Sequence, residues 1–285
     1  CPSISGHNVK ELCRFGAERG LKIPNPAFDT ALAAYLLSPT DSAYPISRLG
    51  QEYLGISPEE HDGGGQQLSF EDIADPYREL RRAAGIITSL IPVLREKLEQ
   101  NGLLRVLTDI ELPLCPVLGA MEAEGFLVDK NALEQFSALL AQGIEALENE
   151  IYALCGMEFN INSPKQLGAV LFEGLMLPAP KKTKTGYSTN ADVLEKLVGK
   201  HPVIPLILKY RQLTKLKSTY ADGLAGVIAG DGRIHTNFQM TVTATGRLSS
   251  TEPNLQNIPV RTELGGEIRK MFVAKPGYVL VDADY

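Results

Sequence analysis

The sequence predicts an α/β region, then a helical region, then a short β region, and three changes in the pattern of apolar residues support this order. Residues 1–100 mix short apolar runs with Gly and Pro, as α/β segments do. Residues 101–230 repeat apolar side chains at helical spacing, and residues 231–285 open with an alternation of period two. We therefore expect three domains with these boundaries.

A helical hairpin is expected at the start of the second domain. Apolar residues recur at helical spacing over 103–121, interrupted by two prolines, and Gly125 then turns the chain. Asp129 is suited to cap a long amphipathic helix whose apolar stripe covers residues 133–154.

Three further helices are expected in the same domain. Ser163 is followed by proline and, three positions on, by glutamine, which is typical of a helix N-terminus. Asn190 is expected to cap another short helix. Pro205 is expected to open a long helix that continues to Ala229.

Charge is unevenly distributed along the chain. The net charge of −6 argues at first against a nucleic-acid partner, because phosphate binding needs a basic surface. Residues 181–217, however, hold nine basic and two acidic side chains. Arg211 and Lys215 fall one turn apart on the long helix, and the lysines of 181–184 belong to a polar tip. This segment is either a solvated face or a surface for an anionic partner.

The third domain is expected to begin and end with a strand. Apolar and polar residues alternate over 234–242, which predicts a strand with one solvated face. A loop-rich stretch covers 246–259. Residues 279–285 have the composition of a buried strand, and the period of two places Asp282 and Asp284 on one side. Two carboxylates at a strand end are typical of a divalent-metal site.

The composition argues against membrane, secreted and zinc-binding classes. No run of about 18 apolar residues and no signal-peptide pattern is present, so we expect no membrane partner and a cytoplasmic location. The four cysteines are scattered and form no C-x-x-C pair, which argues against a disulfide framework or a zinc site. Because Cys1 is not an initiator methionine and the chain ends within a strand pattern, we expect a piece of a longer polypeptide.

Several groups of residues carry a resemblance to a known family. The longest group resembles the stretch of family A DNA polymerases that leads into their first palm motif, and it comprises residues 243–250, residues 253–261 and Asp284-Tyr285. Residues 210–220 resemble the long thumb helix of that family, and residues 184–189 resemble its thumb tip. The resemblance implies a polymerase thumb over 101–230 and the first strands of the palm over 231–285.

The resemblance implies DNA-templated DNA synthesis, in which a nucleotide passes from a deoxynucleoside triphosphate to a primer 3′ hydroxyl, in replication and repair. The implied partners are primer-template DNA and deoxynucleoside triphosphates, for a monomer of the bacterial cytoplasm associated with the nucleoid. A polymerase must hold duplex DNA without reading its sequence, so basic residues are expected to contact phosphates. The residues expected to do so are Arg211, Lys215, Lys217, Lys181, Lys182 and Lys184.

Three polar residues are implied to contact DNA near the primer terminus. Every base pair presents acceptors in similar minor-groove positions, which Arg, Asn and Gln donors are able to bind. By resemblance, Arg247 contacts the minor groove at the primer terminus, and Asn254 and Gln256 touch the nearby template and primer. The alternative is that these side chains only organise an irregular loop, which we favour for Asn257.

The resemblance assigns the catalytic and metal-binding role to Asp284 and leaves Asp282 a structural residue. Nucleotidyl transfer is expected to use two Mg²⁺ ions, one at the primer hydroxyl and one at the triphosphate. The family's second aspartate and its nucleotide-binding helix would follow Tyr285, so the isolated chain is expected to be inactive as a polymerase.

The first domain resembles a truncated 3′–5′ exonuclease of the ribonuclease H-like fold, through residues 6–10 and 28–37. Its catalytic pattern is broken, because Leu12 stands where an acidic residue is needed and residues 76–82 lack the expected tyrosine and aspartate pair. Metal-dependent hydrolysis needs several carboxylates. We expect a degenerate α/β domain over 1–100 that packs against the polymerase and has no nuclease activity.

Two other functions remain open. One is a noncatalytic DNA-binding protein, which primer extension by a longer version of the chain would exclude. The other is a working 3′–5′ exonuclease, which would degrade a single-stranded primer in the presence of Mg²⁺.

Overall fold

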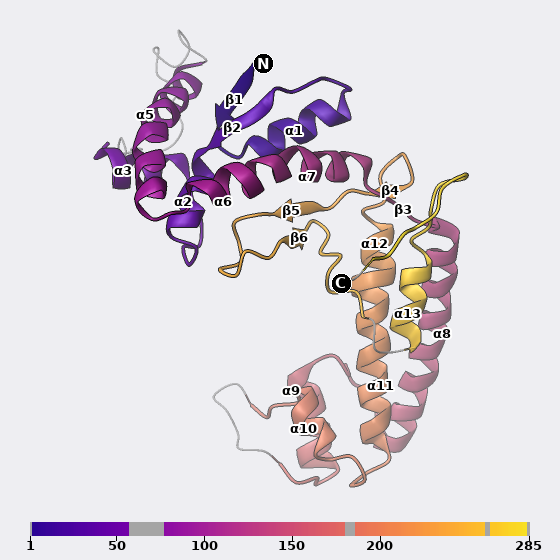
Figure 1. Cartoon of the computed structure of the whole chain (residues 1–285). Helices are drawn as coiled ribbons and strands as arrows, with labels where there is room; N and C mark the ends of the chain where they lie inside the picture. The colour runs from indigo at the N-terminus through magenta and orange to yellow at the C-terminus, as the bar shows by residue number, and fades with distance from the viewer. Residues whose placement is uncertain (1, 57–76, 180–185, 260–262, 284–285) are drawn as a thin grey trace. The chain divides into compact units, whose positions relative to one another are not determined.

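The structure is a computed structural model that describes residues 2–56, 77–179, 186–259 and 263–283 (Figure 1). The chain divides into two compact units: unit 1 comprises Cys1–Gly125 and His235–Asn257, and unit 2 comprises Phe126–Ile234 and Ile258–Tyr285. This division differs from the expected boundaries at residues 100 and 230, because the chain returns to unit 1 at His235. The three-domain boundaries remain a prediction.

Unit 1 begins with an α/β arrangement. Its elements are β1 (Ser3–Gly6), α1 (Val9–Glu18), β2 (Asn25–Asp29) and α2 (Thr30–Leu37). The two strands pair in parallel, and α1 connects them. α2 follows β2 directly because the Asp29 carboxylate accepts hydrogen bonds from two N–H groups in the first turn of α2. The expected α/β character is therefore present, although these elements alone do not establish an exonuclease fold.

Leucines of α5 form much of the core of unit 1. α5 (Arg78–Gln100) packs against α2 and against α3 (Ile46–Leu54). Its Leu90, Leu94 and Leu98 are one turn apart and completely buried. None of the helices in the described ranges is long and apolar enough to cross a bilayer.

A continuous helical stretch follows α5. It consists of α6 (Leu104–Val106), the π-segment η1 (Leu107–Glu111) and α7 (Leu112–Glu124). The expected interruption by Pro113 and Pro116 is wrong, because the helix continues through both. The π-turn just before them widens the helix where a proline ring would otherwise collide with the preceding turn. Gly125, with φ of 63°, ends α7 as expected.

The expected helical hairpin is replaced by other contacts. α7 packs against α1 within unit 1, whereas α8 (Lys130–Cys155) packs against α11 (Val203–Lys215) within unit 2. Between α7 and α8 lies β3 (Phe126–Leu127), which pairs antiparallel with β4 (Arg233–Ile234). Each helix of the expected pair thus packs within its own unit, and β3 lies between them along the chain.

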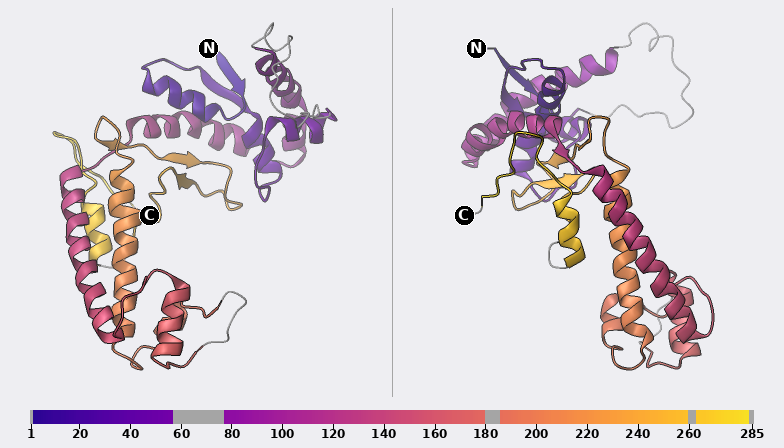
Figure 2. Two further views of the ribbon diagram at one scale, coloured as in Figure 1. Left: turned by 180° about the vertical axis from the view of Figure 1, so that it is seen from behind. Right: turned by 90° about the vertical axis from the view of Figure 1, so that its right-hand side faces the viewer.

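Two long helical rods make up most of unit 2. α8 lies beside α11, whose course continues through the π-segment η3 (Leu216–Asp222) and α12 (Gly223–Ala225) (Figures 1 and 2). Asp129 caps α8 as predicted, because its side chain accepts a hydrogen bond from the Ala132 N–H at 3.0 Å. The long predicted helix is present, but it begins at Val203 and not at Pro205, and it ends at Ala225 and not at Ala229.

The two predicted caps of the short helices are also confirmed. These helices are α9 (Pro164–Ala169), which continues as the π-segment η2 (Val170–Gly174), and α10 (Ala191–Glu195). Ser163 and Asn190 each accept a hydrogen bond from the first turn. Gln166 accepts from the Asn160 N–H at 2.7 Å, so it does not complete a capping box with Ser163.

The strand predicted over 234–242 is divided. β4 ends at Ile234, and β5 (Asn237–Gln239) pairs antiparallel with β6 (Ser249–Thr251) in unit 1. Thr236 lies between the two strands and is buried, with its hydroxyl 2.7 Å from the Ser250 Oγ. Side-chain hydrogen bonds therefore replace the strand ladder at this point.

The predicted terminal strand is wrong for the residues that the structure describes. Residues 279–283 form no strand, and Val279 and Val281 are 81% and 84% exposed. An apolar run becomes a buried strand only where neighbouring strands and covering elements enclose it. Conversely, α13 (Glu263–Lys270) was not predicted, because Gly265-Gly266 in its middle disfavours a helix.

The cysteines of the described ranges are free thiols. Cys13 and Cys115 are buried, and Cys155 is half-buried. Burial raises the pKa of Cys115 to about 12, so this thiol stays protonated and packs as a small apolar group.

Candidate nucleic-acid interface

Arg247 lies in an exposed loop of unit 1 whose backbone is held by hydrogen bonds. The Tyr35 hydroxyl donates to the Thr243 carbonyl at 2.8 Å, and the Thr243 hydroxyl donates to the Arg247 carbonyl at 2.5 Å. Within the described ranges, the Arg247 side chain has no ion pair or hydrogen bond. Its five N–H donors are therefore available to an acceptor outside the chain.

Asn254 and Gln256 organise this loop and still have unused donors. The Asn254 Oδ1 accepts from the Gln256 N–H at 3.0 Å, and the Gln256 Nε2 donates to the Leu248 carbonyl at 3.1 Å. Each side-chain amide carries two N–H donors. Both donors of Asn254 and one donor of Gln256 are not used in these bonds. The sequence left loop organisation and contact with DNA as alternatives for these side chains. The two roles are compatible, because the side chains that organise the loop still have donors for DNA.

A buried serine supports the same loop, and sequence reasoning missed it. Ser250 is 0% exposed, and its Oγ accepts from the Leu255 N–H at 3.0 Å. The Thr236 hydroxyl lies 2.8 Å from the Pro253 carbonyl oxygen, which ties the residue before β5 to the same turn. Ser and Thr in a strand pattern usually face solvent, so the sequence carried no signal for this buried pair.

In unit 2, Lys215 is a cation whose charge is not balanced within the described ranges. Its side chain is exposed and has no ion pair there. Lys217 differs, because its Nζ donates to the Asp222 Oδ2 at 2.7 Å. Residues five apart become neighbours in the wider π-turn of η3. The Lys217 ammonium and then the Ser137 hydroxyl, at 2.6 Å, lower the pKa of Asp222.

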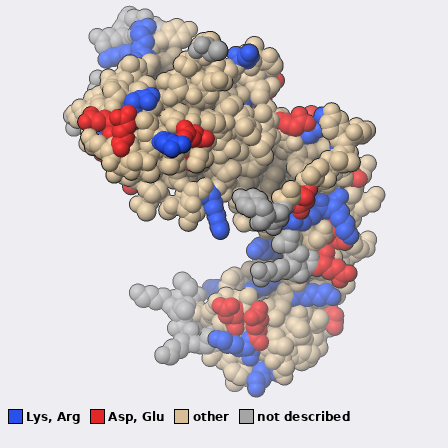
Figure 3. All heavy atoms as spheres, in the orientation of Figure 1, with Lys and Arg blue, Asp and Glu red and all other residues tan. Residues whose placement is uncertain are grey.

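The surface of unit 2 does not present one continuous basic area on the face drawn. Figure 3 shows Lys and Arg side chains interspersed with Asp and Glu over the visible part of this unit. Where basic and acidic side chains alternate in this way, a contact with phosphates would depend on individual cations whose charge is not balanced by a neighbouring carboxylate.

Arg211 has a structural contact that the sequence did not indicate. It donates to the carbonyl of Thr189 and, at 3.1 Å, to the Thr189 hydroxyl. Thr189 is only 3% exposed, and burial lowers the pKa of Arg211. Arg211 therefore holds the segment before α10 against α11. A backbone carbonyl as acceptor has no sequence signature, which is why this contact could not be predicted.

Four of the predicted site residues lie outside the described residues: Asp284, Lys181, Lys182 and Lys184. Asp282 is described and exposed. Among the described residues, no group of three or more His, Cys, Asp or Glu side chains is placed to hold a metal ion. The predicted metal role therefore depends on the chemistry of the Asp284 carboxylate alone.

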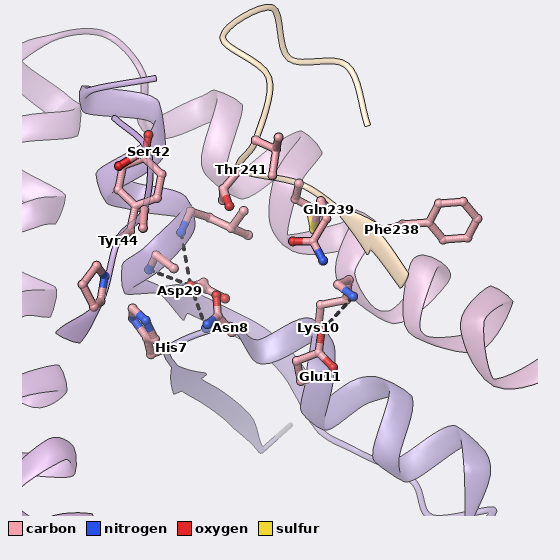
Figure 4. A pocket seen from close by; sticks show the side chains of 16 residues that line it. His7, Asn8, Lys10, Glu11, Asp29, Ser42, Tyr44, Phe238, Gln239 and Thr241 are labelled. Atoms are coloured by element: carbon pink, nitrogen blue, oxygen red, sulfur yellow. Dashed lines mark hydrogen bonds and ion pairs between the residues drawn. The ribbon is translucent and has the colours of Figure 1, made fainter. Parts of the chain in front are cut away.

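The N-terminal part of unit 1 contains a cavity of about 350 Å³ where an exonuclease site was considered (Figure 4). Asp29 lines it but is 1% exposed, and its carboxylate accepts four backbone N–H groups at the starts of α1 and α2. Glu11 and Lys10 lie together on α1 and form an ion pair at 2.9 Å. Among the described lining residues, the carboxylates are thus already engaged.

Curated relatives match nearly the whole chain. Residues 130–285 match the family model described as DNA polymerase family A. The chain is 46% identical over 272 residues to DNA polymerase I of Geobacillus stearothermophilus, a match that covers 94% of this chain and 31% of that protein. It is 43% identical over 274 residues to DNA polymerase I of Bacillus subtilis (strain 168), with 94% and 31% covered. The chain thus spans about a third of the length of these relatives.

A solved structure is also similar to nearly the whole chain. The POL domain of Pol1 from M. smegmatis, in complex with DNA primer-template and dNTP, has a TM-score of 0.84 and 40% sequence identity. The match covers 98% of this chain and 46% of that chain. The family model covers more than half of the chain, and residues 130–285 include Arg211, Lys215, Arg247 and Asp284. The chain therefore belongs to DNA polymerase family A.

Proposed function

We propose that this chain takes part in DNA-templated DNA synthesis, with transfer of a nucleotide from a deoxynucleoside triphosphate to a primer 3′ hydroxyl in replication and repair. The family match over residues 130–285 carries the proposal. The M. smegmatis relative is a complex with DNA primer-template and dNTP, which supports the same partners here. We further propose a monomer of the bacterial cytoplasm that associates with nucleoid DNA.

Primer extension tests this function. The full-length product of the gene that encodes this chain should lengthen a labelled primer on a longer template when dNTPs and Mg²⁺ are supplied. The control is Asp284→Asn, which keeps the size of the side chain and removes its charge. If the unmodified protein extends no primer, the proposal is wrong. Binding of primed DNA without extension would favour the noncatalytic DNA-binding alternative.

We propose that Asp284 holds Mg²⁺. A carboxylate is the hard oxygen ligand that Mg²⁺ prefers, and Mg²⁺ sites for phosphate transfer often use only one or two carboxylates beside the substrate phosphates. When bound, two such ions would activate the primer hydroxyl and neutralise charge on the triphosphate. Asp284 would supply a negatively charged oxygen ligand.

We propose two kinds of DNA contact for the described residues. Lys215 contacts a phosphate, because its ammonium is exposed and its charge is unbalanced. Lys217 contributes less charge to DNA because the Asp222 carboxylate balances it. Arg211 has fewer N–H donors for a phosphate, since two of them bind Thr189. The unused donors of Arg247, Asn254 and Gln256 suit acceptors in the minor groove. Lys181, Lys182 and Lys184 are proposed phosphate contacts on charge alone.

Replacing Lys215 and Arg211 by alanine should have contrasting effects. Lys215→Ala is expected to weaken DNA binding equally for all sequences and to lower the slope of log K against log salt by about one. Its free energy of unfolding should change by less than about 0.5 kcal/mol. Arg211→Ala should lower the free energy of unfolding by about 1.5–3 kcal/mol, because a charged donor to the Thr189 carbonyl is lost.

The measurements are fluorescence anisotropy on a primed duplex between 50 and 200 mM KCl and urea unfolding followed by circular dichroism. Lys217→Ala is the matched control for Lys215, because its charge is balanced by Asp222. An unchanged salt slope for Lys215→Ala would contradict the proposed phosphate contact of Lys215. Equal stability of the Arg211 and Lys215 variants would contradict the structural contact of Arg211.

We propose that the N-terminal segment is a degenerate exonuclease-like domain that serves as a scaffold. Leu12 follows Glu11 on α1 at the position where a carboxylate is needed, and Asp29 is engaged by backbone N–H groups. The chain is therefore expected to leave a labelled single-stranded primer intact in the presence of Mg²⁺, at the level of an EDTA control. Shortening of the primer that EDTA prevents would instead establish the exonuclease alternative.

A further inference from the structure

A buried ion pair links α1 to α7 in unit 1. The Lys10 Nζ lies 2.6 Å from the Glu122 Oε1, and the two residues are 7% and 1% exposed. The Lys10 ammonium also donates to Glu11 at 2.9 Å and to the Asn237 Oδ1 at 3.0 Å. All three N–H donors of Lys10 are thus used within the chain.

The same pair holds the start of the β5–β6 ladder. The Glu122 Oε1 accepts the Phe238 N–H at 2.7 Å, while Lys10 binds the side chain of Asn237. The carbonyl of Glu122 lies 2.8 Å from the His235 Nδ1, which must carry the hydrogen because a carbonyl only accepts. His235, Asn237 and Phe238 are therefore bound to Lys10 or Glu122, across sequence separations of 113 to 227 residues.

Contacts continue from β5 to the residues proposed to touch DNA. Asn237 is paired with Thr251 and Gln239 with Ser249 across the ladder. The Ser250 Oγ between those two partners accepts the Leu255 N–H, which lies between Asn254 and Gln256. Arg247 precedes β6 by two residues. The position of β5 thus determines the positions of the Arg247, Asn254 and Gln256 side chains.

Stability alone does not explain a buried ion pair at this place. Desolvation of two charges is costly, and apolar pairs of similar volume are often as stable or more stable. The second carboxylate oxygen of Glu122 is buried and accepts no hydrogen bond within the described ranges, and the Arg14 Nη1 at 4.0 Å offsets this cost only in part. An apolar pair cannot accept the Phe238 N–H, and therefore it cannot hold the three-residue strand β5 in one register.

We propose that Lys10 and Glu122 are positioning residues that fix the register of β5 and thereby place Arg247, Asn254 and Gln256 for contact with primer-template DNA. The inference rests on the proposed function of these three residues. It gives the N-terminal segment a role in DNA contact that does not require nuclease activity.

The test compares binding of two primed duplexes by the chain of residues 1–285. One has guanine at the primer terminus, and the other has 3-deazaguanine, which lacks the minor-groove N3 acceptor. The unmodified chain is expected to bind the modified duplex roughly fivefold or more weakly. Lys10→Met/Glu122→Leu removes the charges together and should bind the two duplexes within about twofold of each other, because the donors are displaced.

Two controls separate positioning from folding. Glu122→Gln keeps an acceptor for the Phe238 N–H and should keep the discrimination of the unmodified chain. Hydrogen exchange at the Leu90, Leu94 and Leu98 amides reports whether the core of unit 1 is intact. If the double variant does not fold, Asn237→Val removes the bonds that the Asn237 Oδ1 accepts from Lys10 and from the Gln239 Nε2 while leaving the Lys10–Glu122 pair, and it should reduce the discrimination in part.

The outcomes are distinct. Equal discrimination by the unmodified chain and by a folded double variant would overturn the positioning role and leave the proposed DNA contacts in place. Equal binding of both duplexes by the unmodified chain would overturn the minor-groove contacts themselves, and the inference with them. Loss of discrimination in the folded double variant and its retention in Glu122→Gln would support the inference.

Discussion

Arg247→Ala is expected to lower kcat/KM for primer extension by the full-length gene product by about 5- to 150-fold, which corresponds to about 1–3 kcal/mol for a specific donor pair. The loop backbone is held at Thr243 and at the Arg247 carbonyl, while the guanidinium has no partner within the described ranges. A loop backbone held in this way loses little freedom on binding. Affinity for primed DNA should fall much less, because many phosphate contacts remain.

Arg247→Lys distinguishes the two kinds of contact that arginine makes. Lysine keeps the positive charge but lacks the planar fork that binds two acceptors together. If Arg247 binds minor-groove acceptors, Arg247→Lys should extend primers nearly as poorly as Arg247→Ala. Recovery of most of the activity by lysine would show a simple phosphate contact, and parallel losses of binding and extension in Arg247→Ala would show the same. Single-turnover extension with saturating dNTP, together with anisotropy, gives both quantities.

Local signals in the sequence predicted the helix starts well. Asp129, Ser163 and Asn190 each cap the helix that follows, because the bond joins residues only three positions apart. The stripe of α8 was also predictable, since Leu133, Phe136 and other stripe residues are buried at helical spacing. These features depend on the sequence within one or two turns.

Contacts between distant segments could not be predicted from such signals. Arg211 and Thr189 are 22 residues apart, and Lys10 and Glu122 are 112 apart. Sequence reasoning assigned Arg211 only to DNA, because a clustered cation suggests an anionic partner and its backbone acceptor is invisible. Lys10 belongs to the exonuclease-like segment of residues 6–10, and no local pattern distinguishes Glu122 from a solvent-exposed helical glutamate.

The strand predicted at the end of the chain shows a different limit. The apolar composition of residues 279–283 indicates a buried strand, yet burial depends on neighbours that composition cannot supply. Family resemblance contributed what periodicity could not. It selected Arg247, Asn254 and Gln256 from a loop whose residues have no regular spacing, and the structure then showed which of their donors are unused.

Asp29→Ala is expected to lower the free energy of unfolding of unit 1 by about 2–4 kcal/mol. Its carboxylate accepts the Asn8 and Val9 N–H groups at the start of α1 and the Ala31 and Leu32 N–H groups at the start of α2. Loss of one cap costs about 0.5–2 kcal/mol, and here two helices lose theirs at a site only 1% exposed. Urea unfolding and hydrogen exchange of these amides measure the effect.

Asp29→Asn tests the contributions of the two carboxylate oxygens separately, through exchange at individual amides. The Oδ1 accepts from Asn8, Ala31 and Leu32, and the Oδ2 accepts from Val9 at 2.7 Å. An asparagine that keeps its oxygen in the Oδ1 position retains the α2 cap but presents an N–H donor to the Val9 N–H. Exchange at Val9 should therefore speed up while exchange at Ala31 and Leu32 stays slow. A carboxylate held for catalysis would behave differently, because its removal usually leaves stability unchanged or raises it, so unaltered stability in Asp29→Ala would make this residue a candidate for a nuclease site.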